Sequence, residues 1–162
     1  MAVEIERKFL VADERWRVNE DGSAVEGIAF RQGYLPCEGL TTVRVRLEGD
    51  QARLTIKGKN EGLTRSEFEY PIPVGDAMDM LDNLCQRPLI EKIRYCRSQG
   101  DLTWEIDVFE GENAGLVVAE VELISEDQMV EMPEWVGQEV SGDPRYYNVN
   151  LVSNPYCHWQ QK

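Results

Sequence analysis

Apolar and charged residues alternate with a period of two along most of this chain. Seven short segments carry apolar side chains at every second position and ionised side chains between them. Successive side chains of a β-strand point to opposite faces, and the Gly, Pro, Asn and Asp residues between the segments are typical of turns. The pattern predicts about eight antiparallel strands, at residues 3–11, 28–36, 41–48, 52–58, 65–72, 89–97, 102–109 and 116–124.

The polar face of these strands is almost purely ionic. A water-facing sheet of an ordinary sandwich is one interpretation, but like charges two positions apart repel each other unless an opposite charge lies between them. Divalent cations would relieve the acidic pairs, and a polyanion would relieve the basic groups. The pattern therefore favours a closed or nearly closed sheet with its ionic face inward. The acidic pairs are Glu4/Glu6, Glu105/Asp107 and Glu120/Glu122, and the basic groups are Lys8, Arg44/Arg46, Lys57 and Lys92/Arg94.

A few helices are expected to cover the outward apolar faces, which makes the fold class mainly β (α+β). Residues 74–86 have apolar side chains at helical spacing. Ser125 and Asp127 suggest the start of a second short helix, and Asp143-Pro144 supplies the first residues of a third that runs to about Leu151. Residues 12–27 and 110–115 are expected to be loops, with Trp16 in a flexible region.

Composition and charge narrow the classes of function. With 162 residues, 42% of them apolar, the chain is the size of one domain, which we place at residues 1–152 with a tail at 153–162. A net charge of -13 argues against binding to nucleic acid or an anionic membrane. The charged amino terminus and the lack of a long apolar run lead us to expect a cytoplasmic protein.

The cysteines and the histidine give no clear signal of chemistry. The four cysteines stand far apart without a C-x-x-C pair, so they imply neither a zinc site nor a disulfide framework, and at least three are expected to be reduced packing residues. His158 is the single histidine, for which a packing or exposed role is expected rather than catalysis.

The motifs resemble those of a known family. Glu4-Ile5-Glu6-Arg7-Lys8 is the E-x-E-x-K motif found near the amino terminus of the CYTH domain, or triphosphate tunnel metalloenzyme, family. The resemblance extends at least from residue 3 to residue 151, and its specificity comes from the order and number of the motifs. The further motifs are Arg31-Gln-Gly-Tyr34-Leu, Arg44-Val-Arg46, Thr55-Ile-Lys57-Gly, Glu91-Lys92-Ile-Arg94-Tyr, Glu105-Ile-Asp107-Val, Glu120-Val-Glu122 and Asp143-Pro-Arg145-Tyr.

The resemblance implies an eight-stranded antiparallel closed β-barrel that binds a small-molecule triphosphate with Mg²⁺ or Mn²⁺, at two metal sites. It implies that Glu4, Glu6 and Glu122 surround one metal, and that Glu105, Asp107 and Glu120 hold a second metal near the attacking water. The expected phosphate ligands are Lys8, Arg44, Arg46, Lys57, Arg94 and Arg145. In similar short bacterial triphosphatases, the residues matching Tyr34 and Lys92 are thought to activate water.

Hydrolysis of inorganic triphosphate to pyrophosphate and phosphate is the function that we expect. No tryptophan is placed to read an organic group, which favours the inorganic substrate. The alternatives are a nucleoside triphosphatase, a thiamine triphosphatase or an adenylyl cyclase of the same family, and a binding module without turnover. For Lys92, crowded by Arg94, we expect a lowered pKa and the role of general base; a plain phosphate ligand is the alternative. A homodimer is left open.

Overall fold

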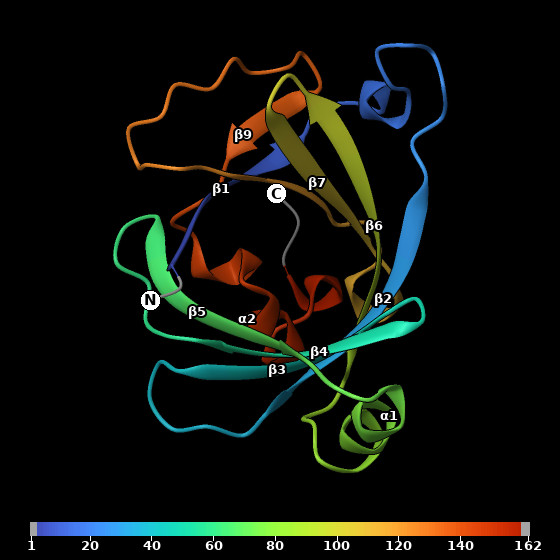
Figure 1. The fold of residues 1–162 in the computed structure, drawn as a ribbon, viewed down its shortest axis with the longest axis vertical. Helices are drawn as coiled ribbons and strands as arrows, with labels where there is room; N and C mark the ends of the chain where they lie inside the picture. Colours follow the sequence, from blue (N-terminus) through green and yellow to red (C-terminus); the bar gives the residue numbers. More distant parts are fainter. Residues whose placement is uncertain (1–2, 160–162) are drawn as a thin grey trace.

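The protein is an antiparallel β-barrel with short helices outside and at its ends (Figure 1). The computed structural model describes residues 3–159. Eight strands form the barrel, and a short ninth strand pairs with the first of them. The strands are β1 (Val3–Val11), β2 (Gly27–Leu35), β3 (Thr42–Glu48), β4 (Gln51–Lys57), β5 (Thr64–Pro71), β6 (Ile90–Gln99), β7 (Leu102–Phe109), β8 (Val117–Glu122) and β9 (Val136–Glu139).

The barrel closes because β1 pairs with a strand on each side. Its first residues pair with β5, with Val3 opposite Ser66, and its middle pairs with β8, with Lys8 opposite Glu120. The ring therefore runs β1, β5, β4, β3, β2, β6, β7, β8 and back to β1. The expected eight-stranded antiparallel closed barrel is confirmed, and each predicted strand lies within a few residues of an observed one.

The apolar faces of the strands point outward, where other segments cover them. Helix α1 (Val74–Asn83) packs Ala77 and Leu81 against the outside of β3 and β4. On the opposite side, Trp104 and its neighbours on β7 and β8 pack under Trp16 and Trp135. These two parts of the hydrophobic core lie outside the barrel, which leaves much of the barrel interior to the charged residues.

Helix α2 (Asn148–Ser153) and the 3-10 turn before it, η3 (Pro144–Tyr146), together replace the single helix expected over 143–151. Leu151 is fully buried among residues that include Tyr34 and Ile90, and Figure 1 shows α2 within the outline of the ring. The segment expected as a tail continues through Ser153 into a further 3-10 turn, η4 (Tyr156–His158), and Trp159 then packs on Tyr146.

Two local expectations were wrong. The segment 12–27, expected to be a loop, contains a 3-10 turn, η1 (Arg15–Arg17), and a bridge between Val18 and Ala24, and Trp16, expected in a flexible region, is only 1% exposed. Ser125 does not start a helix. Its hydroxyl donates to Asp127 at 2.8 Å, and the carbonyl of Ser125 accepts from the Gln128 amide, so these groups close a turn on themselves.

The cysteines also differ from expectation. All four are free thiols, but only Cys85 is buried, whereas Cys37, Cys96 and Cys157 are exposed and are not packing residues. Within the part of the chain that the structure describes, no helix has both the length and the apolar character needed to cross a membrane.

Candidate active site

A polar cavity of about 370 Å³ occupies the barrel interior. Its volume is within the range of small-molecule sites. Charged side chains from both walls of the barrel line it, with acidic and basic residues in equal number. The acidic residues are Glu4, Glu6, Glu48, Glu67, Glu69, Glu105, Glu120 and Glu122, and the basic residues are Lys8, Arg44, Arg46, Arg53, Lys57, Arg65, Lys92 and Arg94.

Neighbouring strands place the acidic residues side by side. In the β-ladders Glu6 lies opposite Glu122, and Glu120 lies opposite both Lys8 and Glu105. Glu4 lies farther along β1, where the ammonium of Lys57 donates to its carboxylate at 3.0 Å. Strands β7, β8 and β1 therefore form an acidic wall.

The crowding of this acidic wall shifts the pKa values of its carboxyls. Burial, together with the charges of Glu120 and Glu4, raises the pKa of Glu6 well above its ordinary value. Burial also raises the pKa of Glu105 and of Glu122, and neighbouring glutamates raise both further. Three carboxyls of one wall thus resist ionisation because they are buried close to other carboxyls, whereas neighbouring cations lower the pKa of Glu4 and of Glu120.

The basic wall lies on the other side of the ring. Strand β3, which carries Arg44 and Arg46, is four strands away from β8 in either direction around the barrel. Phe30 lies between two guanidinium groups, with its ring centre 4.7 Å from Arg46 and 4.9 Å from Arg94. Among residues 3–159, Arg44 Nε is the buried side-chain donor without a hydrogen-bond partner.

Lys92 is buried at the edge of the cavity with only 1% of its surface exposed. Its Nζ donates to Asp107 Oδ2 at 2.8 Å and to Asn148 Oδ1 at 2.9 Å. Burial lowers the pKa of Lys92 to about 7, and the positive charges of Arg94 and Arg46 add to this effect against the opposing charge of Asp107. The lowered pKa that we expected from the sequence is thus present in the folded protein.

A network of neutral side chains joins the two residues expected to activate water. The Gln32 side-chain amide donates to Asn148 Oδ1 at 3.2 Å and to the hydroxyl of Tyr34 at 3.4 Å, while Gln32 Oε1 accepts from Arg46 at 2.8 Å. Asn148 Oδ1 therefore accepts from both Lys92 and Gln32. The sequence alone did not indicate Asn148 and Gln32 as site residues. An uncharged side-chain amide that lies among motifs of charged residues does not reveal a functional role by its residue type.

Two expected site residues do not line this cavity. Burial alone would raise the pKa of Asp107, but Arg94 and Lys92 occupy both of its oxygens and lower the pKa to about 2. Arg145 is exposed, where it pairs with Asp143 at 2.8 Å and stacks on Trp159. The structure thus places Asp107 behind the basic residues and Arg145 outside the cavity, while the other expected site residues line it.

Comparison with known proteins agrees with this architecture. The model of the CYTH domain matches residues 2–150. An inorganic triphosphatase of Acetivibrio thermocellus is 46% identical over 161 residues, which cover 99% of this chain and 100% of the relative. An inorganic triphosphatase of Nitrosomonas europaea is 39% identical over 154 residues, or 92% of this chain and 96% of the relative.

A crystal structure of an inorganic triphosphatase supports the same assignment. It covers 94% of this chain and 95% of its own, with a TM-score of 0.65 at 34% identity. The family match extends over nearly the whole chain, and it includes every strand of the barrel. This chain therefore belongs to the CYTH domain family.

Proposed function

We propose that this protein hydrolyses inorganic triphosphate to pyrophosphate and phosphate, with Mg²⁺ or Mn²⁺ as cofactor. The observation that carries the proposal is the cavity inside the closed barrel, in which an acidic wall faces a basic wall. Phosphoryl transfer requires positioning and charge neutralisation more than covalent chemistry from the protein. Two relatives named inorganic triphosphatase, at 46% and 39% identity, support the choice of substrate.

The acidic wall fits hard divalent cations. Glu4, Glu6, Glu105, Glu120 and Glu122 supply carboxylate oxygens, which are the donors that Mg²⁺ and Mn²⁺ prefer. The raised pKa values in this wall indicate that added positive charge would stabilise the ionised carboxylates. When bound, such cations neutralise phosphate oxygens and polarise the attacking water. We propose two metal sites within this set of five residues.

The basic side chains of the cavity fit the phosphate groups. Lys8, Arg44, Arg46, Lys57 and Arg94 line the cavity, and guanidinium groups bind phosphate oxygens at two points. The unpartnered Nε of Arg44 is a buried donor that a phosphate oxygen would satisfy. Arg145 is not assigned to this set, because its guanidinium is paired with Asp143 at the surface.

Lys92 is placed to accept the proton of the attacking water. A neutral amine has two hydrogens, and the two observed acceptors, Asp107 and Asn148, can take both, so the lone pair is left for the water. As the water oxygen bonds to the terminal phosphorus, its proton passes to Lys92 Nζ. The bond to the bridging oxygen breaks, and the electron pair leaves with pyrophosphate.

Tyr34 and Asp107 support this step. The Tyr34 hydroxyl accepts from Gln32, so its own hydrogen remains available to orient the water. Asp107 holds Lys92 and Arg94 in place through both of its oxygens, which makes it a positioning residue in this proposal.

An organic triphosphate is a second candidate substrate, because an apolar cavity adjoins the site. This cavity has a volume of about 410 Å³, and the residues that it shares with the polar cavity are Tyr34, Thr42, Arg65, Tyr147 and Val149. Leu35, Leu40 and Val149 add apolar surface. An organic group attached to the triphosphate could lie there while the phosphates lie in the polar cavity.

The products formed from a panel of triphosphates test the function. The purified protein is assayed with inorganic triphosphate, ATP and thiamine triphosphate, each with Mg²⁺ and with Mn²⁺. We expect the fastest release of phosphate from inorganic triphosphate. Faster turnover of ATP or thiamine triphosphate would favour the second candidate, and formation of cyclic AMP with pyrophosphate would identify a cyclase.

A variant of the acidic wall separates an enzyme from a binding module. Glu105→Ala should retain triphosphate binding, measured by calorimetry, and lose turnover, because this carboxylate lies beside Glu120 at the proposed metal sites. Binding of triphosphate by the unaltered protein without turnover, under all metals tested, would refute the hydrolase proposal.

A further inference from the structure

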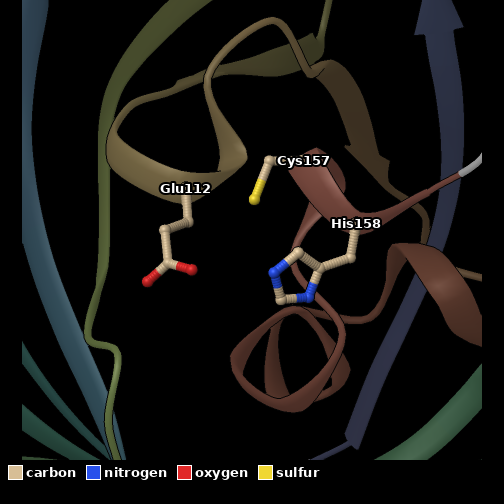
Figure 2. A group of neighbouring side chains, drawn as sticks. All are labelled: Glu112, Cys157 and His158. Atoms are coloured by element: carbon tan, nitrogen blue, oxygen red, sulfur yellow. The ribbon is translucent and has the colours of Figure 1, made fainter.

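Outside the barrel, three potential metal ligands of different chemistry come together. Glu112 lies in the 3-10 turn η2 (Gly111–Asn113) between β7 and β8, and Cys157 and His158 lie in η4 near the end of the chain. A carboxylate oxygen, the Sγ atom and an imidazole nitrogen all lie within 4.8 Å of one another. Figure 2 shows the three side chains ending around a shared space.

The two turns are held together by contacts that do not involve these three side chains. Asn113, which is 2% exposed, accepts a hydrogen bond from the Tyr156 amide at 2.8 Å. The Tyr156 ring packs on Trp159 with a centroid distance of 5.0 Å, and Trp159 in turn packs on Tyr146. The hydrogen bond joins the two turns next to the ligands, and the aromatic contacts hold η4 in place, which lowers the entropy cost of binding an ion.

The ligand types select a borderline metal rather than the hard cation proposed for the barrel. Thiolate and imidazole ligands suit Zn²⁺ and Co²⁺, whereas Mg²⁺ and Mn²⁺ prefer oxygen. Zinc binds sulfur at about 2.3 Å and nitrogen at about 2.0 Å, so the ligand atoms need to approach one another only slightly. All three side chains are exposed, which gives an ion free access and allows them to rotate.

We propose that Glu112, Cys157 and His158 bind one Zn²⁺-class cation, with water in the fourth position. The four cysteines gave no zinc signal in the sequence because no two of them lie close together, and this site uses a single cysteine with the adjacent His158 and with Glu112, which lies 45 residues before Cys157. Binding ties η4 to η2 and releases the thiol proton. The site is independent of the function proposed for the barrel.

Spectroscopy with Co²⁺ tests the site directly. The full chain is reduced, saturated with Mg²⁺ to occupy the carboxylates of the barrel, and titrated with Co²⁺. We expect a sulfur-to-cobalt charge-transfer band that reaches its maximum at one equivalent. Oxygen ligands give no such band, and because Cys96 also lines the barrel cavity, the band must persist in Cys96→Ser. Competition with Zn²⁺ then gives the affinity of the site for zinc.

Matched variants assign the ligands. Cys157→Ser should abolish the band, and His158→Ala and Glu112→Gln should each weaken binding by about tenfold or more. The controls are Cys37→Ser and Glu110→Gln, which change exposed residues of the same types outside the cluster and should bind as the unaltered protein does. A missing band in the unaltered protein, a band retained in Cys157→Ser, or unchanged binding in either of the other two variants would overturn the proposal.

Discussion

Replacing Asn148 by aspartate should move the pH dependence of hydrolysis in a direction that identifies the role of Lys92. The substitution keeps the shape of the side chain and the acceptor oxygen, which lies 2.9 Å from Lys92 Nζ. It adds a negative charge at that distance. An opposite charge this close favours the ammonium form and typically raises a lysine pKa by about 1–3 units, starting here from about 7.

The two roles of Lys92 predict opposite changes. A general base acts when deprotonated, so a raised pKa moves the acidic limb of the pH–rate profile upward by about one unit or more. A phosphate ligand acts when protonated, so the same shift would extend activity to higher pH and leave the acidic limb unchanged. Our mechanism requires the first result.

The assay is phosphate release from inorganic triphosphate across the pH range, with metal and substrate saturating. Asn154→Asp is the matched control, because it adds the same charge at an exposed position after α2. Its profile should overlay that of the unaltered protein. An unmoved acidic limb in Asn148→Asp, with thermal unfolding showing an intact fold, would refute the base assignment.

Three further predictions concern binding and stability. Arg44→Ala should reduce kcat/KM roughly 10- to 150-fold, since a charged hydrogen bond contributes about 1.5–3 kcal/mol. Arg145→Ala should change kcat/KM less than about twofold in the same steady-state assay. Equal losses in the two variants would contradict the placement of Arg44 in the cavity and of Arg145 outside it. The hydrogen bond from Arg7 lowers the pKa of Glu139 in the folded protein, so the pair stabilises the fold at pH values above 4.5, the ordinary glutamate pKa, and this stabilisation is lost as the pH falls through the lower pKa of the folded state. Glu139→Gln should therefore lower the free energy of unfolding by about 0.2–1 kcal/mol at pH 7 and by nothing in acid, measured by urea unfolding. A cost that does not change with pH would exclude the ion pair as the cause. Trp16→Ala should destabilise the fold by about 3–5 kcal/mol in the same unfolding experiment, because the side chain is 1% exposed; a negligible change would support the flexible segment expected from the sequence.

The barrel could be predicted from the sequence because, within each strand, residues for the apolar outer face alternate with residues for the charged inner face. In β3, for example, Val45 is fully buried on the outer side while Arg44 and Arg46 line the cavity. Strand β9 could not be predicted in this way. Its four residues, V-G-Q-E, have one apolar side chain, and the strand forms because β1 continues beyond its pairing with β5 and offers backbone groups near Phe9 and Val11.

Site residues could be predicted from the sequence where like charges two positions apart indicate an ion or a ligand between them. Uncharged site residues could not be predicted in this way. The acidic pairs and the arginine pair could be found from their spacing. Gln32 and Asn148 are 116 residues apart, and only the fold brings their side chains within 3.2 Å. Spacing also cannot distinguish a carboxylate that faces the cavity, such as Glu105, from one whose oxygens are occupied by cations, such as Asp107.

The equal number of acidic and basic side chains in the cavity bears on how the substrate is bound. The cavity is lined by as many carboxyl groups as basic side chains, so a bare triphosphate would place its negative charge beside crowded carboxyls such as Glu6, whose pKa is already raised. Entry of divalent cations alone would leave an excess of positive charge in the cavity. A complex of triphosphate with two divalent cations is close to neutral and carries charge of both signs at its two sides, which matches the opposed walls. The low dielectric of a closed barrel makes any uncompensated charge costly, so binding of metal and triphosphate should be strongly cooperative.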